Sequence, residues 1–148
     1  QIIVREYWIR SKLPSYLNMP VYLAIADDKP INRQTVKDKI AGYTELKLLI
    51  EARNGRDFLE QLKDAKQKPD VVLIDLEMPE MDGYEATRTI RALGNKKAQV
   101  RIMAMTANAT PEEILKCFES GVNEYISKPF VPEELFEKLE TQVAAGKG

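Results

Sequence analysis

Histidine is absent from all 148 residues of the chain. This absence excludes histidine general bases, Ser–His and Cys–His nucleophile pairs, and most zinc sites, because each of these needs an imidazole. Any chemistry that the chain performs must therefore depend on carboxylates, hydroxyls and amines.

Cysteine occurs once, at Cys117, so the chain cannot form an internal disulfide. A single cysteine fits a reducing compartment, and no segment has the basic, apolar and small-residue order of a secretory signal. We therefore expect a cytoplasmic protein in which Cys117 is a small apolar filler on a helix. The chain begins with Gln1 rather than Met, which suggests that it is part of something longer.

An excess of charge of one sign is also lacking, since 22 basic residues face 23 acidic ones and the net charge is −1. A balanced charge gives no reason to expect binding to nucleic acid or to an anionic membrane surface. The apolar runs are far too short to cross a bilayer. The sequence thus predicts no nucleic-acid partner and no membrane partner within these residues.

Residues 1–20 differ from the rest, with aromatic and basic residues in no clear period and two prolines that interrupt them. We interpret this segment as an N-terminal arm, either a docking or dimerising element or a linker. A regular pattern covers residues 21–143, which we predict to be one domain. The Gly-rich, charged residues 144–148 are expected to form a flexible C-terminal end.

Within residues 21–143, short apolar runs alternate with amphipathic stretches, which is typical of repeated βα units around a parallel sheet. Proline at a first helical position and an N-cap residue ahead of it mark several helix starts, such as Thr110-Pro111. The fold class is therefore α/β, a three-layer doubly wound (βα)5 domain. The predicted strands are residues 21–26, 46–52, 70–74, 100–105 and 124–126.

Polar residues of different kinds follow four of these five strands. In a parallel sheet with right-handed crossovers, the carboxyl ends of all strands meet at one edge, and ligands bind there. We therefore expect these residues to lie together: Asp27, Asp28, Asp75, Thr106 and Lys128. The second strand runs into Arg53-Asn54-Gly55, which is turn chemistry only.

Three carboxylates at one edge would repel each other unless a cation lay between them. Oxygen-only ligands without Cys or His favour a hard ion, and a small cluster suits Mg²⁺ better than Ca²⁺. An ionised Asp75 beside such an ion can act as a nucleophile toward phosphorus. Lys128 offers a positive charge and Thr106 a hydroxyl donor to the transferred group, so these residues form a phosphoryl-accepting site.

These segments resemble those of a known family, the receiver domains of two-component response regulators. Residues 71–91, VVLIDLEMPEMDGYEATRTIR, are similar to the phosphorylation-site stretch of that family, and IADDKPINR to its acidic-pair loop. The segments AMTANAT and YISKPF are similar to its hydroxyl and lysine loops. The resemblance implies a flavodoxin-like (CheY-like) sheet of strand order 2-1-3-4-5.

The resemblance also implies a role for each matched position. Asp75 would be the phosphoacceptor, with Asp28 binding Mg²⁺ directly, Asp27 acting through water, and the backbone carbonyl of Glu77 as a further ligand. Thr106 would hydrogen-bond the phosphoryl group and Lys128 would pair with it. Tyr125 would be an aromatic switch residue, the alternative being a half-buried edge aromatic with no switching role. The Lys128-Pro129 bond would be cis.

The function implied is a phosphorylation-dependent signalling switch, which is no enzyme apart from catalysing its own phosphorylation and dephosphorylation. A histidine kinase or a histidine phosphotransfer protein would supply the phosphoryl group, and an output domain or a downstream protein would respond. Asn32-Arg33 and the run from Tyr84 to Arg88 are similar to receivers of hybrid histidine kinases.

Three other functions remain open at this point. A haloacid-dehalogenase-like phosphatase also uses an aspartyl phosphate, and Asp75-Leu76-Glu77 approximates its motif, but its nucleophile follows the first strand. A flavodoxin-like electron carrier would need a phosphate-binding loop where Asp27 and Asp28 stand. A degenerate receiver would serve only as an interaction module, yet all five site residues are present.

Overall fold

The computed structural model describes residues 20–147, so all but the last residue of the predicted N-terminal arm lies outside the described residues. Five parallel strands form one sheet in the order β2-β1-β3-β4-β5. This order confirms the predicted doubly wound fold. The strands are β1 (Val21–Ala26), β2 (Leu46–Ala52), β3 (Val71–Asp75), β4 (Arg101–Thr106) and β5 (Glu124–Ser127).

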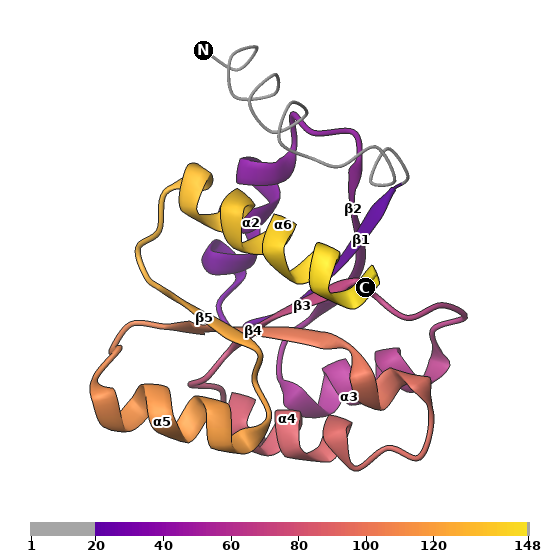
Figure 1. Ribbon diagram of the computed structural model, residues 1–148, viewed down its shortest axis with the longest axis vertical. Helices are drawn as coiled ribbons and strands as arrows, with labels where there is room; N and C mark the ends of the chain where they lie inside the picture. The colour runs from indigo at the N-terminus through magenta and orange to yellow at the C-terminus, as the bar shows by residue number, and fades with distance from the viewer. Residues whose placement is uncertain (1–19, 148) are drawn as a thin grey trace.

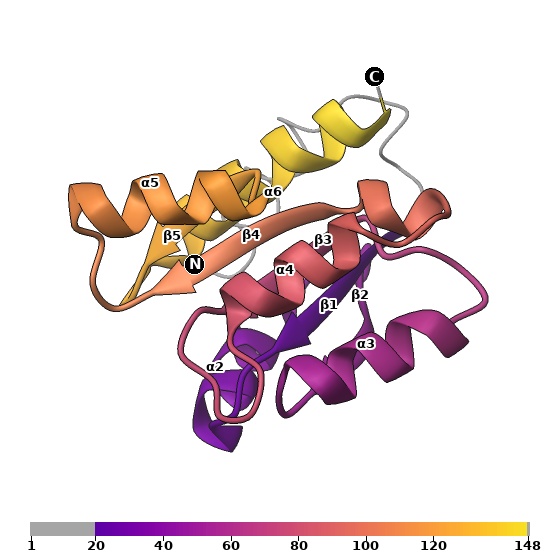
Figure 2. The ribbon, with the colours of Figure 1, turned by 90° about the horizontal axis from the view of Figure 1, so that it is seen from below.

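Helices cover both faces of this sheet and make three layers (Figures 1 and 2). In Figure 1, α2 and α6 lie on one side of the sheet and α3, α4 and α5 on the other. Among the helices of residues 20–147, none combines the length and apolarity that crossing a bilayer requires. The helices are α2 (Pro30–Ile40), α3 (Gly55–Asp64), α4 (Gly83–Arg91), α5 (Pro111–Ser120) and α6 (Pro132–Lys147), with a short 3₁₀ helix, η2 (Lys96–Gln99).

Side chains ahead of the helices satisfy backbone N–H groups that a helix start leaves without partners. Asn54 accepts a hydrogen bond from the amide of Asp57, 2.8 Å away, and so begins α3. Thr110 does the same for Glu113 at 3.2 Å and begins α5. Asn54 is therefore a helix cap, which agrees with the structural rather than chemical interpretation of the second strand end.

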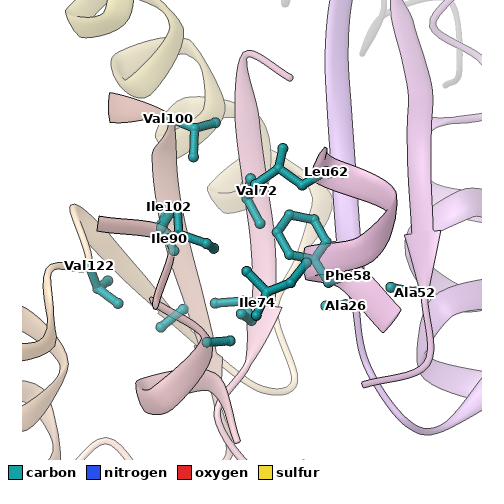
Figure 3. Packing of buried hydrophobic residues seen from close by; sticks show 14 of the residues in the cluster. Ala26, Ala52, Phe58, Leu62, Val72, Ile74, Ile90, Val100, Ile102 and Val122 are labelled. Atoms are coloured by element: carbon teal, nitrogen blue, oxygen red, sulfur yellow. The ribbon is translucent and has the colours of Figure 1, made fainter. Parts of the chain in front are cut away.

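The larger core cluster lies between the sheet and helices α3, α4 and α5 (Figure 3). Phe58 and Leu62 of α3 and Ile90 of α4 are fully buried against Val72 and Ile74 of the central strand. Burial of an apolar side chain of this size stabilises the fold by about 1.5–3 kcal/mol. Side chains of β3 pack into a core cluster on each face of the sheet, so helices on both sides hold this strand in place.

The second cluster joins the other face of the sheet to α2 and α6. Leu135, Leu139 and Val143 recur at four-residue spacing and so share one face of α6, and they are 0%, 3% and 4% exposed. Helix α6 continues to Lys147 and so includes most of residues 144–148, which the sequence analysis assigned to a flexible end; Ala144 and Ala145 favour helix.

Some strand bounds differ slightly from the sequence predictions. Strands β3 and β4 begin and end one residue later than expected, so that Asp75 and Thr106 are the last strand residues rather than the first residues after them. Pairing of Asp75 with Met105 in the ladder extends β3 by that residue. In addition, the apolar residues Leu115 and Phe118 of α5 are 60% and 45% exposed.

Candidate functional site

The carboxyl ends of the strands bring together side chains that are far apart in the sequence. Asp27 follows β1, Asp75 ends β3, and Lys128 follows β5. The ammonium nitrogen of Lys128 lies 3.2 Å from Asp27 Oδ2 and 3.3 Å from Asp75 Oδ1. The expected meeting of three strand ends is therefore observed, and Lys128 neutralises part of the charge of two carboxylates there.

Asp27 is fully buried and is held on both of its carboxylate oxygens. Its Oδ1 accepts from the backbone N–H of Lys29 at 3.0 Å and from the side-chain amide of Asn32 at 3.3 Å. Its Oδ2 accepts from Lys128. A buried carboxylate needs such partners, because leaving its charge uncompensated would be costly.

Asp28 is partly buried, and its Oδ1 is a buried oxygen that no donor of residues 20–147 satisfies. One oxygen from each of Asp27, Asp28 and Asp75 lies within 4.8 Å of the others. Buried polar atoms normally have partners, so such an oxygen next to two further carboxylates calls for a cation. The three residues fit a hard divalent ion, because they offer oxygen donors only.

Asp75 is 7% exposed. Burial raises the pKa of Asp75 above its usual range, the Lys128 ammonium opposes this increase, and the charge of Asp27 adds to it. Its Oδ1 also faces the backbone N–H of Glu77 at 3.4 Å. The environment thus keeps the Asp75 carboxylate out of bulk water, with a cationic group beside it.

Glycine at position 83 allows α4 to begin directly against the backbone of Asp75. A Cβ at Gly83 would lie 2.5 Å from the Asp75 carbonyl oxygen and 2.9 Å from the Cα of Leu76. The amide of Gly83 donates to the carbonyl of Leu76 at 3.1 Å. The loop after β3 is therefore folded back tightly, and the position of Asp75 depends on the absence of a side chain at residue 83.

Thr106 connects the site to α5. Its buried hydroxyl accepts from the amide of Asn108 at 3.0 Å, and its backbone carbonyl accepts from the amide of Lys128 at 2.7 Å. Three residues after Asn108, helix α5 begins at Pro111. Any movement of the Thr106 side chain would therefore act on the loop that leads into α5.

Tyr125 lies in strand β5 and is partly buried. Its ring meets that of Phe118 edge to face, with centroids 6.4 Å apart, and the Lys138 ammonium lies 5.4 Å from its centroid. Together with exposed Leu115, these residues form an aromatic and apolar surface on α5 and β5. The Lys128-Pro129 peptide bond is cis, as the resemblance implied.

Three contacts near the site were not foreseen from the sequence. Arg33 of α2 bonds both Glu51 and the backbone carbonyl of Asp27, each at 2.8 Å. The Tyr84 hydroxyl donates to Glu113 Oε1 at 2.8 Å. Burial, and next this hydrogen bond, raise the pKa of Tyr84. Such contacts depend on how helices pack, and the only signal was the likeness of Asn32-Arg33 and Tyr84 to receivers of hybrid kinases.

Cys117 is 1% exposed and belongs to the core cluster beside α4, as expected of a small apolar filler. Burial raises the pKa of its thiol. A thiol of this kind is protonated and poorly accessible, so it is no candidate nucleophile.

A family model, curated sequences and solved structures all relate the chain to one family. The family model of the response regulator receiver domain matches residues 23–140. Chemotaxis protein CheY1 of Helicobacter pylori is 34% identical over 120 residues, which cover 80% of this chain and 93% of CheY1. Sensor histidine kinase CheAY of Helicobacter pylori is 38% identical over 117 residues, 77% of this chain.

The chain spans only 14% of the length of CheAY. Among solved structures, it is similar to the receiver domain of sensor histidine kinase PA1611 from Pseudomonas aeruginosa, with a TM-score of 0.74 and 29% identity over 84% of this chain and 98% of that one. That receiver was solved with a magnesium ion coordinated in its active-site cleft.

Proposed function

The chain belongs to the response regulator receiver domain family, and from this premise we propose that Asp75 accepts a phosphoryl group from a phosphohistidine donor in a Mg²⁺-dependent reaction. The observation that carries the proposal is the position of Asp75, a buried carboxylate with Lys128 at 3.3 Å and two further aspartates around it. A carboxylate held in this way is a nucleophile toward phosphorus.

The proposed step is a displacement at phosphorus. A carboxylate oxygen of Asp75 forms a bond to phosphorus as the bond from phosphorus to the imidazole nitrogen of the donor breaks, and the electron pair of that bond stays on the nitrogen. The 148 residues contain no histidine, so the phosphohistidine donor lies outside them. Its class is a histidine kinase or a histidine phosphotransfer protein.

We assign the cation site to Asp27, Asp28, Asp75 and the backbone carbonyl of Glu77. Asp28 would bind directly through the oxygen that lacks a partner, while Asp27, whose oxygens already accept three hydrogen bonds, would act through water. When bound, Mg²⁺ neutralises charge on the transferred group and its surroundings. The PA1611 receiver with its magnesium ion supports this assignment.

Lys128 and Thr106 are proposed to hold the transferred group. The Lys128 ammonium is within 3.3 Å of Asp75, so it is near enough to pair with an oxygen of the phosphoryl group. The Thr106 hydroxyl, which accepts from Asn108, can donate its own proton to another phosphoryl oxygen. A cavity of about 340 Å³, lined by Asp27, Lys128 and Phe130, lies next to these groups on the side of α2.

Movement of Thr106 toward the phosphoryl group would change the loop of residues 107–110 and the start of α5. Tyr125 would then turn inward, and the surface of Leu115, Phe118 and Tyr125 would change its shape. This is a shift of population between two states of one fold. An output domain or a downstream protein that recognises that surface completes the proposed switch.

Two further assignments accompany this function. The chain is a signalling module whose own chemistry is limited to gain and loss of the phosphoryl group on Asp75, and the cytoplasm is its proposed compartment. The phosphatase alternative receives no support, since the family model and the relatives are those of receivers and of proteins that contain them.

Incubation of the chain with Mg²⁺ and acetyl phosphate, followed by intact mass, tests the proposal. We expect the mass of one phosphoryl group to be added to the wild type and none to Asp75→Asn. The variant Asp64→Asn, which changes an exposed aspartate at the end of α3, serves as the matched control and should gain the same mass. An undiminished gain in Asp75→Asn would contradict the proposal.

A further inference from the structure

We infer that Arg33 is a positioning residue for the cation site, held in place by Glu51, a role that rests on the proposed function of that site. The Arg33 side chain is only 13% exposed although it carries a charge. Its Nε donates to Glu51 Oε2 at 2.8 Å, and its Nη1 donates to the backbone carbonyl of Asp27 at 2.8 Å. The guanidinium thus joins strand β2 to the end of β1.

The bond to the Asp27 carbonyl controls the residue that follows. The peptide unit is planar, so a donor that holds the carbonyl oxygen of Asp27 also holds the amide nitrogen and the Cα of Asp28. On its other side, the amide of Asp27 donates to the carbonyl of Ala52 at 3.1 Å. Arg33 therefore sets the direction in which Asp28 presents its unsatisfied oxygen.

The neighbouring Asn32 has a different role. Its side-chain amide contacts the carboxylate of Asp27 rather than the backbone. Two consecutive residues of α2 thus hold Asp27, one by its side chain and one by its main chain. Of these two side-chain contacts from α2, that of Arg33 is the one that acts on the backbone leading to Asp28.

Glu51 makes this contact specific to arginine. It lies on β2 and also pairs with Lys37 at 3.0 Å, so its carboxylate is held from two directions. The planar guanidinium offers donors on separate sides, which lets one group reach Glu51 and the other the Asp27 carbonyl. A lysine has a single nitrogen, and it cannot reproduce both bonds in the same geometry.

The direction in which the Mg²⁺ affinity changes when Arg33 is replaced distinguishes a positioning role from a purely electrostatic one. Removal of a positive charge near the aspartates should strengthen the binding of a cation, because Arg33 repels it. Loss of the bond that orients Asp28 should weaken the binding instead. A purely structural ion pair would lower the stability of the fold and leave the affinity for the cation unchanged.

The test is a Mg²⁺ titration of the 148-residue chain, followed by amide chemical shifts in NMR spectra. We expect Arg33→Ala to raise the Kd for Mg²⁺ about tenfold, which is the usual size of an effect on the residues that orient metal ligands. Lys37→Ala is the matched control, because Lys37 shares Glu51 but makes no contact with Asp27 among the residues described; its Kd should stay within about twofold of the wild type.

Arg33→Lys provides a second variant that keeps the charge and a long side chain, should Arg33→Ala fold poorly. It should also weaken Mg²⁺ binding. In phosphorylation by acetyl phosphate, the Mg²⁺ concentration for half-maximal rate should rise in both variants, while the rate at saturating Mg²⁺ should be restored to within about twofold, since the chemical groups at Asp75 are intact.

The Mg²⁺ titrations distinguish the cation site itself from the role of Arg33 in it. If Mg²⁺ shifts no amides of the wild type, the proposed cation site itself is wrong. If the wild type binds Mg²⁺ and the folded Arg33 variants bind it as tightly or more tightly, the proposed cation site stands and the positioning role of Arg33 is overturned.

Discussion

The ammonium group of Lys128 lies 3.3 Å from the carboxylate of Asp75, in the space where three aspartates converge. Its nitrogen is also 3.2 Å from Asp27, so a single cationic side chain bridges the ends of β1 and β3. A divalent ion at the same aspartates would compete with this ammonium, because both are attracted by the same carboxylate oxygens.

Lys128→Met should therefore separate cation binding from phosphoryl transfer. Without the ammonium, the aspartates repel each other more strongly and should bind Mg²⁺ more tightly, by about two- to tenfold in Kd. Phosphorylation by acetyl phosphate should become slower by at least about tenfold, because the charge that pairs with the phosphoryl group is lost. The NMR titration with Mg²⁺ and intact mass measure the two effects, and weaker Mg²⁺ binding would contradict the competition.

Gly83→Ala should destabilise the fold and slow phosphorylation together. The added Cβ would lie 2.5 Å from the carbonyl oxygen of Asp75, so α4 or the end of β3 must shift. Such overpacking typically lowers the free energy of unfolding by about 1–3 kcal/mol. Urea unfolding measures this change. Gly94→Ala is the matched control, because a Cβ there would meet nothing within 4 Å; its effect should be within about 1 kcal/mol.

The bond between Tyr84 and Glu113 should contribute measurable stability between α4 and α5. Tyr84→Phe removes a hydroxyl that donates to a carboxylate at 2.8 Å, and we expect the free energy of unfolding to fall by about 1–2 kcal/mol. A double-mutant cycle with Glu113→Gln measures the coupling of the two side chains. Glu112→Gln, an exposed change on the same helix, should stay within about 0.5 kcal/mol. Additive effects in the cycle would show that the two side chains are not coupled.

The stability of the chain should depend on the ionisation of Glu51. Hydrogen bonds from Arg33 and Lys37 lower the pKa of Glu51 in the folded state. A lowered pKa means that the folded protein favours the ionised form, so the stabilisation is present above the unfolded pKa of about 4.3 and is lost as the pH falls through the folded pKa.

Glu51→Gln should therefore be less stable than the wild type at pH 7, by no more than about 1 kcal/mol because the group is partly exposed. The difference should disappear as the pH falls through the lowered folded pKa of Glu51, because below it the wild-type carboxyl is protonated as well. Urea unfolding at pH 7 and at acidic pH measures both differences. A gap that stays the same size at acidic pH would mean that ionisation of Glu51 is not its source.

The fold was predictable because each strand of the sheet is a short apolar run and each helix start carries its own chemistry. Pro30, Asn54 and Thr110 mark helix starts that the structure contains. The ends of β3 and β4 were placed one residue early, since a polar residue such as Asp75 looks like a loop residue until its ladder partner is known.

The candidate site was predictable to the extent that strand ends must meet at one edge of a parallel sheet. The order of Asp27, Asp75 and Lys128 along the chain carries that information. The contacts that hold these residues in place were not predictable, because Arg33 reaches Glu51 only through the packing of α2 beside β2. The exposure of Leu115 was equally hidden, since an apolar residue on a helix normally indicates the buried face.

The contact between Lys128 and Asp27 joins residues that are 101 positions apart in the sequence. During synthesis from the amino end, β1 and β3 are made long before the lysine that completes their polar edge. The phosphoryl-accepting site of an incomplete chain therefore lacks its cationic side chain until the fifth strand has been added. The proposed modification of Asp75 would accordingly depend on a chain that is complete at least as far as Lys128.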